Sequence, residues 1–132
     1  MINTYDIYLI SDSTGETLER IFLAIKAQFK NFKYKTHFYS FTRTENQISK
    51  ILEVSEKNSN AIVLYTIVDN KLARHLSNEC SSKNIPCFGI SIITDLGVPG
   101  KIVKVTHADV QKVASKAEIT MTKFIKRFFE EI

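Results

Sequence analysis

A run of small polar residues, Ser-Asp-Ser-Thr-Gly at positions 11–15, is the part of the sequence best suited to chemistry. The carboxylate of Asp12 and the hydroxyls of Ser13, Thr14 and Thr17 surround Gly15, just before a predicted helix. Free backbone N–H groups and the helix dipole favour an anion at such a position, so we expect a phosphate there. One glycine matches neither the dinucleotide fingerprint nor the Walker loop. An ordinary capped turn, with Ser13 and Glu16 as a capping box, is the equal alternative.

Three further polar side chains follow the second and third predicted strands. Arg43 and Thr44 come after one strand and Asp69 after the next. If the first strand lies between these two, as in flavodoxin-like order, all three approach the loop at 11–15, together with Thr66. Thr44 with Gln47 also has the form of a helix cap, and Asp69 can serve as a cap alone.

Other reactive residue types show no catalytic or metal-binding pattern. His37 and His75 have no serine, cysteine or carboxylate at an interval typical of a catalytic triad, so we expect them to be structural or exposed. Cys80 and Cys87 lack the paired spacing of a zinc site and are expected to be buried free thiols. The sequence predicts no metal.

Short apolar runs alternate with amphipathic segments along the chain. The predicted strands cover residues 5–10, 34–41, 61–65 and 87–93; the predicted helices cover residues 16–30, a segment after Thr44, and 69–83. This alternation is typical of an α/β three-layer sandwich with a mostly parallel sheet of four to five strands, flavodoxin-like or Rossmann-like. We expect residues 1–132 to form a single α/β domain.

A long final helix is predicted to begin after Thr106. Its apolar residues recur at helical spacing up to Ile132. The stripe either covers the sheet or packs against a second copy of the chain, which would make a homodimer.

Composition narrows the class of protein. The chain has 132 residues, a net charge of +4 and 44% hydrophobic residues, enough for one core. It has no apolar run long enough to cross a membrane and no signal-peptide pattern at its start, so we expect a cytoplasmic protein. The basic residues are not accompanied by the aromatic stacking positions of a nucleic-acid site, so no nucleic-acid partner is expected.

Four segments resemble the amino-terminal half of the pyruvate, phosphate dikinase regulatory proteins over residues 5–88. These are IYLISDSTGETLERIFLAIKAQF, FTRTENQ, IVLYTIVDNKLARHL and NIPC. Members of that family phosphorylate a threonine of the dikinase, or of phosphoenolpyruvate synthase, with ADP, and remove that phosphate with inorganic phosphate. The resemblance implies ADP and phosphate as ligands and either enzyme as partner. It extends to residues 11–17 and to Arg43 and Thr44, without assigning their individual roles.

The nucleotide-binding loop of the family, which contains a Ser-Arg-Thr-Ser-Lys-Thr run, has no match among the 132 residues. The resemblance therefore implies a truncated relative of this transferase and kinase family that lacks kinase activity alone. Whether the chain is an enzyme is left open.

The last third resembles a different family. The segment CFGISIITDLGVPGKIVKVTHADVQKVASKAEITMTKFI is similar to the carboxyl-terminal end of trimeric purine nucleoside phosphorylases. That resemblance implies purine contact by Asp95 and a place near the ribose for His107, with a hybrid junction at residues 84–91. The phosphate- and ribose-binding segments of that family are absent, and Asp95 and His107 also fit a strand end and a first helical turn. Nucleoside binding and a non-catalytic scaffold are the alternatives.

Overall fold

The computed structural model describes residues 4–90, together with separate positions at 112, 115–117, 119–120, 122–124, 126–127 and 130. The chain divides into two compact units, Met1–Ser91 and Ile92–Ile132. The boundary lies at the end of the predicted junction at 84–91. A single domain over residues 1–132 stays a prediction.

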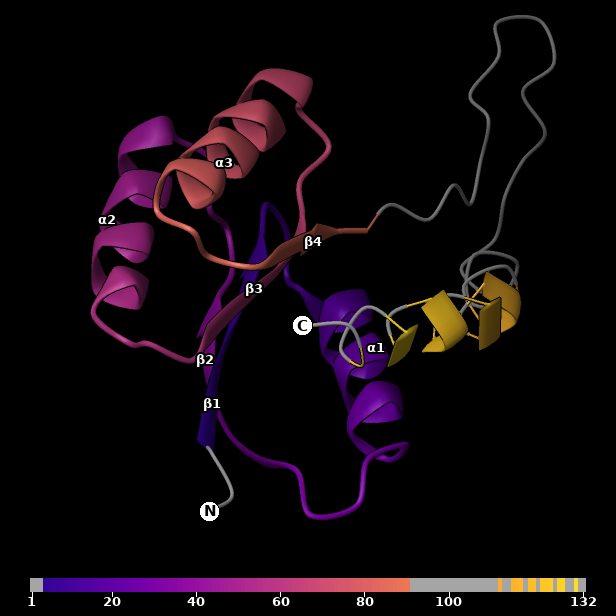
Figure 1. The fold of residues 1–132 in the computed structure, drawn as a ribbon. Helices are drawn as coiled ribbons and strands as arrows, with labels where there is room; N and C mark the ends of the chain where they lie inside the picture. Colours follow the sequence, from indigo (N-terminus) through magenta and orange to yellow (C-terminus); the bar gives the residue numbers. More distant parts are fainter. Residues whose placement is uncertain are drawn as a thin grey trace, which may run out of the picture. The chain divides into compact units, whose positions relative to one another are not determined.

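The first unit is built on a four-stranded parallel sheet (Figure 1). Its strands are β1 (Thr4–Ser11), β2 (Lys33–Tyr39), β3 (Ala61–Thr66) and β4 (Cys87–Gly89), in the spatial order β2-β1-β3-β4. All three pairings are parallel. β1 and β3 lie inside the sheet, which is why their apolar runs are nearly continuous.

Three helices connect the strands: α1 (Glu16–Lys26), α2 (Glu45–Glu56) and α3 (Asn70–Ser82). α1 lies on one face of the sheet, and α2 and α3 lie side by side on the other (Figure 1). This is the predicted α/β layered arrangement, and the strand order is the flavodoxin-like one.

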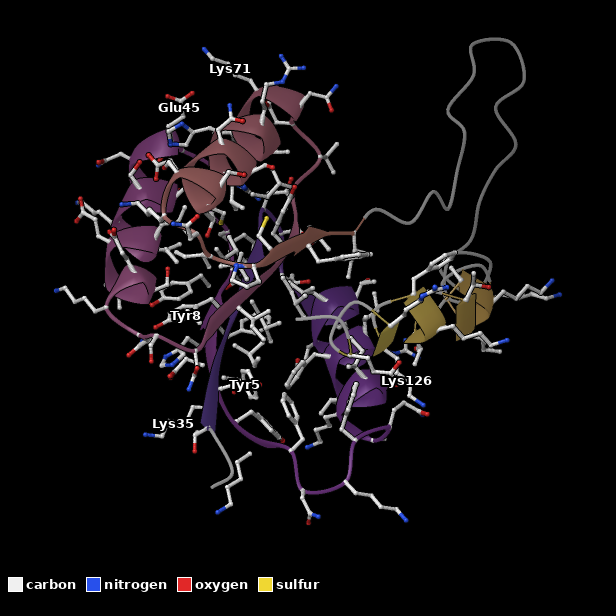
Figure 2. All side chains as sticks on the ribbon, in the orientation of Figure 1. Tyr5, Tyr8, Lys35, Glu45, Lys71 and Lys126 are labelled. Carbon is white, nitrogen blue, oxygen red and sulfur yellow. The ribbon has the colours of Figure 1, made fainter. Side chains whose placement is uncertain are left out.

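The core has a layer on each face of the sheet because successive side chains of a strand point in opposite directions. Tyr8 and Ile10 of β1 belong to the layer beneath α2 and α3, with Val63, Leu76 and Cys80. On the other face, α1 contributes its own buried stripe of Leu18, Ile21, Phe22 and Ile25. Figure 2 shows Tyr8 on the α2 side of the sheet.

Two predicted boundaries are wrong. α1 ends at Lys26 and not near Lys30, because the chain turns before Asn31, whose φ is +61°. This turn brings the Phe29 and Phe32 rings to 5.8 Å from each other. β2 ends at Tyr39, two residues early, because the backbone after it bonds to the loop that follows β1.

The predicted strand over residues 87–93 is observed only as Cys87–Gly89, and its last residues lie outside the described part of the chain. Most of the predicted final helix, and with it the homodimer prediction, also lies outside the described residues. Within the described residues, no helix is long and apolar enough to cross a membrane.

Candidate functional site

The predicted site residues come from loops at the carboxyl edge of the sheet. The chain leaves β1 toward one neighbouring strand, β2, and later enters the other neighbour, β3, so the strand order reverses between β1 and β3. Loops on the two sides of such a point run to opposite faces of the sheet and leave a crevice. Here the crevice is bounded by the loops after Ser11 and Thr66. Figure 2 shows Glu45 and Lys71, at the starts of α2 and α3, at one end of the unit.

Three hydrogen bonds join these two loops. The Val68 N–H donates to Asp12 Oδ2 at 2.8 Å, and the Asp12 N–H donates to the Thr66 carbonyl at 3.2 Å. The Thr66 hydroxyl donates to Ser11 Oγ at 3.2 Å, and the Ser13 N–H reaches the same oxygen at 3.1 Å. The Asp12 carboxylate therefore holds the loop after β3 in place as well as lying at the site.

The segment after β2 completes the edge. The Phe41 N–H donates to the Ser13 carbonyl and the Thr42 N–H to the Ser11 carbonyl, both at 2.9 Å. Arg43 Nε donates to the Asp12 carbonyl at 3.0 Å, and its guanidinium carbon lies 5.3 Å from the centre of the Phe41 ring. Phe41 has a φ of +53°, which an aromatic residue adopts only when its surroundings hold it there. The structure thus brings Arg43 to the loop, as predicted.

The amino end of α1 is open. Its N-cap is Gly15, with a φ of +79°, and no side chain of the described residues caps it. The predicted capping box of Ser13 and Glu16 is therefore wrong: Ser13 instead bonds to Ser11 and to the segment after β2. A Cβ at Gly15 would lie 2.4 Å from Phe38 Cζ. Among the described residues, the first-turn N–H groups of α1 therefore have no side-chain cap.

The remaining candidates take two kinds of position. Thr44 caps α2 in a capping box: its hydroxyl accepts the Gln47 N–H at 3.2 Å, and Gln47 Oε1 accepts the Thr44 N–H at 3.1 Å. Asp69 caps α3 by accepting the Leu72 N–H at 2.9 Å. Thr14 and Thr17 are exposed beside the open end of α1. Thr44 and Asp69 therefore act as helix caps, whereas Thr14 and Thr17 are exposed residues.

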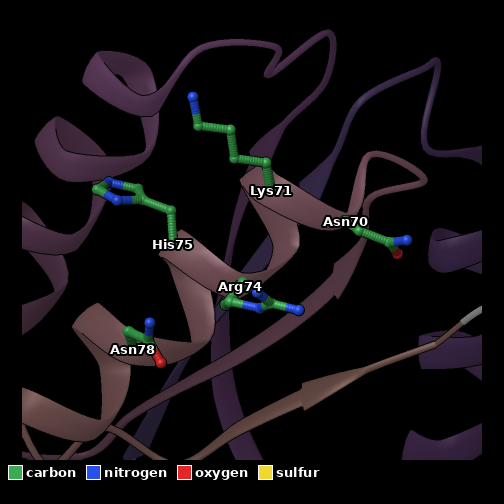
Figure 3. A pocket seen from close by; sticks show the side chains of 5 residues that line it. All are labelled: Asn70, Lys71, Arg74, His75 and Asn78. Atoms are coloured by element: carbon green, nitrogen blue, oxygen red, sulfur yellow. The ribbon is translucent and has the colours of Figure 1, made fainter.

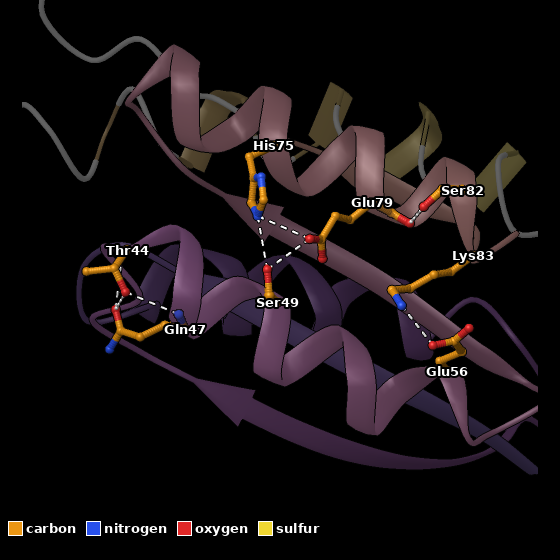
Figure 4. A network of polar contacts seen from close by, with 8 residues as sticks. All are labelled: Thr44, Gln47, Ser49, Glu56, His75, Glu79, Ser82 and Lys83. Atoms are coloured by element: carbon orange, nitrogen blue, oxygen red, sulfur yellow. Dashed lines mark hydrogen bonds and ion pairs between the residues drawn. The ribbon is translucent and has the colours of Figure 1, made fainter.

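One polar cluster, between α2 and α3, was missed in the sequence (Figure 4). The Ser49 hydroxyl donates to Glu79 Oε1 at 2.8 Å, and His75 Nε2 lies 3.1 Å from Ser49 Oγ and 3.3 Å from Glu79 Oε1. A catalytic triad would place the carboxylate on the other ring nitrogen, so this arrangement is a structural clamp. The spacing of His75 and Glu79, four residues apart on one helix, was the available signal.

His37 also has a carboxylate partner. Its Nε2 lies 2.9 Å from Asp6 Oδ1 across neighbouring strands, and its ring stacks on Tyr8 at 4.5 Å. Both histidines are structural, as expected, although each is paired.

A surface recess of about 450 Å³ lies along α3 (Figure 3). It is lined by Asn70, Lys71, Arg74, His75 and Asn78. All five belong to one helix, and none is a predicted site residue. Within the described residues, no group of three or more His, Cys, Asp or Glu side chains could hold a metal ion. Asp95 and His107 lie outside the described residues.

The fold and its edge loops define an α/β protein with a candidate anion site at the switch point of a parallel sheet. The sequence model of the Kinase/pyrophosphorylase family matches residues 7–127, so the chain belongs to that family. The match includes the whole of the segment, residues 87–125, that resembles a nucleoside phosphorylase, a resemblance that stays a prediction.

Relatives in three bacteria carry names that provisionally assign them as pyruvate, phosphate dikinase regulatory proteins. The protein of Pelagibacter ubique (strain HTCC1062) is 67% identical over 90 residues, which is 68% of this chain and 33% of that protein. Those of Chelativorans sp. (strain BNC1) and Geotalea uraniireducens (strain Rf4) are 43% identical over 65% and 68% of this chain, and 31% and 32% of their own lengths. The chain spans about a third of the length of these relatives.

Proposed function

We propose that this chain is a regulatory protein of pyruvate, phosphate dikinase, or of phosphoenolpyruvate synthase, and that it binds a phosphate at the open amino end of α1. Membership of the Kinase/pyrophosphorylase family and the names of its relatives support the partner. The single structural observation that supports the phosphate is the helix that starts at Gly15 without a side-chain cap among the described residues.

The surroundings of this helix end suit an oxyanion. Thr14 precedes Gly15 and Thr17 lies in the first turn of α1; both residues are exposed, and the N–H groups of that turn can donate to phosphate oxygens. The Arg43 side chain, anchored through Nε on the Asp12 carbonyl, adds a positive charge at the same edge. Asp12 is the opposing charge, and its Oδ2 is occupied by the Val68 N–H. The site thus combines backbone donors, hydroxyls and one cation around the loop at 11–17.

Binding of phosphate by this chain does not imply that the chain can transfer phosphate from ADP. The Ser-Arg-Thr-Ser-Lys-Thr run of the family's nucleotide loop does not occur among the 132 residues. We therefore expect the 132-residue chain by itself to bind phosphate and its partner without transferring phosphate from ADP.

The test uses two glutamate substitutions at equivalent positions of two helices. Thr17 and Asn46 are both exposed and both second in their helices, but α2 is closed by the Thr44 capping box and α1 is open. Thr17→Glu should weaken binding of inorganic phosphate and pyrophosphate at least about fivefold, since a like charge a few ångströms away costs on the order of 1–4 kcal/mol at a protein surface. Asn46→Glu should leave affinity unchanged.

Amide chemical shifts of the labelled chain, followed during each titration, locate and measure the binding. The same three proteins are then tested for capture of purified dikinase and phosphoenolpyruvate synthase. Capture of either enzyme by the unsubstituted chain supports the partner, and capture of neither overturns it. Equal phosphate affinity in all three proteins would mean that the phosphate binds at another site. Amide shifts produced by inosine and not by phosphate would favour the nucleoside-binding alternative.

A further inference from the structure

Basic residues without acidic neighbours in the sequence gather at the amino edge of the sheet. Residues 20–44 contain no aspartate or glutamate, although the whole chain has 14. The basic residues of this stretch are Arg20, Lys26, Lys30, Lys33, Lys35 and Arg43. Four of them fall within residues 26–35, which run from the end of α1 into the start of β2. Figure 2 shows Lys35 toward the end of the unit opposite Glu45 and Lys71, and therefore away from the candidate phosphate site.

Aromatic rings form the base of this surface. The centre of the Phe32 ring lies 5.6 Å from that of Tyr5 and 5.8 Å from that of Phe29. Phe32 also stacks on Tyr34, with ring centres 5.4 Å apart. Lys26 Nζ donates a hydrogen bond to the Tyr34 hydroxyl at 2.8 Å and lies 5.4 Å from the centre of the Tyr34 ring. These contacts hold in place the turn between α1 and β2, on and after which the other lysines lie.

The other three lysines, Lys30, Lys33 and Lys35, are named here the lysine edge. All three are exposed, and in the described part of the chain no ion pair involves them. Asp6 lies opposite Lys35 in the register of β1 and β2, but its Oδ1 is 2.9 Å from His37 Nε2. Closely spaced like charges repel one another, so binding of an anionic group at the lysine edge is favourable.

We propose that the lysine edge is a docking surface for an acidic segment of the partner enzyme; this inference rests on the proposed function. Carboxylates along such a segment are complementary to the three ammonium groups, and charge complementarity of this kind selects a partner and speeds its association.

Two other anionic partners fit the surface less well. Single-stranded nucleic acid binds where its bases can stack on open ring faces, whereas Phe32 and Lys26 both lie against the ring of Tyr34. A lipid surface takes up exposed apolar side chains. Among the described residues, none of the exposed large hydrophobic side chains lies within residues 26–35. A protein segment needs neither feature.

The test compares two triple variants of the full chain that lose the same charge. One is Lys30→Gln/Lys33→Gln/Lys35→Gln, which removes the lysine edge. The control is Lys50→Gln/Lys71→Gln/Lys116→Gln, which removes three exposed lysines outside it. Binding of purified dikinase and of phosphoenolpyruvate synthase is measured at physiological ionic strength, where distant charges are screened. Loss of three surface ion pairs should weaken binding to the first variant at least about threefold, and the control should bind as the unsubstituted chain does.

A synthetic peptide of alternating glutamate and serine locates the surface. In the first unit, its amide shifts should be confined to residues 26–35, and a peptide with glutamine in place of glutamate should cause none. Unchanged enzyme binding in the first variant, or an equal loss in both variants, would overturn the docking surface while the partner stands. Capture of neither enzyme by the unsubstituted chain would overturn the proposed function and this role together. Shifts at residues 26–35 caused by a single-stranded oligonucleotide or by phosphatidylglycerol vesicles, and not by the peptide, would overturn the proposal in favour of that partner.

Discussion

Tyr8 is a fully buried residue whose hydroxyl keeps a polar partner. Its ring stacks on His37, and its oxygen accepts a hydrogen bond from Asn58 Nδ2. Burial is the main cause that raises the pKa of the hydroxyl; Asn58 lowers it, and the charges of Asp6 and Tyr39 raise it further. The Tyr8 phenolate is therefore harder to form in the folded protein than in the unfolded chain. For this reason Tyr8 makes the free energy of unfolding depend on pH in the alkaline range.

The sign of that coupling gives a prediction for Tyr8→Phe. As pH rises above about 10, the unfolded tyrosine releases its proton before the folded one, so the unfolded state gains and stability falls. Tyr8→Phe has no such proton to release. Its free energy of unfolding should therefore fall less steeply with rising pH than that of the unsubstituted chain. At neutral pH the variant should be less stable by about 1 kcal/mol, because Asn58 loses its acceptor. Urea unfolding at several pH values measures both effects, and parallel pH profiles would contradict the assignment.

At the scale of elements, α1 and α2 differ in how the backbone N–H groups of their first turns are satisfied. α2 satisfies its first-turn donors through Thr44 and Gln47, whereas α1 begins at Gly15 with its donors free of side chains from the described residues. A closed helix end contributes stability, while an open one can receive a ligand. The starts of α1 and α2 lie at the same edge of the sheet. The presence or absence of a side-chain cap, and not their position, is therefore what distinguishes the candidate phosphate site at α1.

Removing the cap of α2 should therefore cost stability. Thr44→Ala is expected to lower the free energy of unfolding by about 1 kcal/mol, the usual loss for an N-cap threonine. Thr17→Ala, which removes an exposed threonine from the first turn of α1, is the matched control and should change stability little. Denaturant unfolding of the three proteins measures the difference; an equal loss in both variants would show that Thr44 does not act as a cap.

At the scale of the molecule, the first unit holds the hydrophobic core of the described residues. Among the described residues, the buried hydrophobic side chains all lie between Ile7 and Ile90, on both faces of the sheet. A hydrophobic core with a layer on each face of a sheet is typical of a unit that folds independently.

We therefore expect residues 1–91 to fold without residues 92–132. The shortened chain should give dispersed amide resonances and a single cooperative thermal transition, since it keeps every buried hydrophobic residue of the described part of the chain. The amide shifts of residues 4–90 in the two chains provide the comparison. A chain that binds hydrophobic dyes and unfolds without cooperativity would show that the second unit is needed for the fold.

Several features were determined by local sequence alone. The alternation of apolar runs with amphipathic segments predicted the α/β class and all seven elements of the first unit, because burial on a sheet or beneath a helix imposes its own period on hydrophobic residues. The caps at Thr44 and Asp69 were equally readable, since a cap and its partner lie three residues apart in the chain. The resemblance to the dikinase regulatory proteins also rested on local sequence, in four segments within residues 5–88.

Only the tertiary structure decided what meets at the edge of the sheet and within its core. The Asp12 bond to Val68 and the clamp of Ser49 with His75 and Glu79 both depend on strand order and helix packing. The early end of β2 and the open start of α1 also arise from backbone bonds between distant segments. Such pairings produce no periodic pattern in the sequence, because each depends on which strands become neighbours. The order of the strands is determined by the energy of the whole core and not by any local pattern.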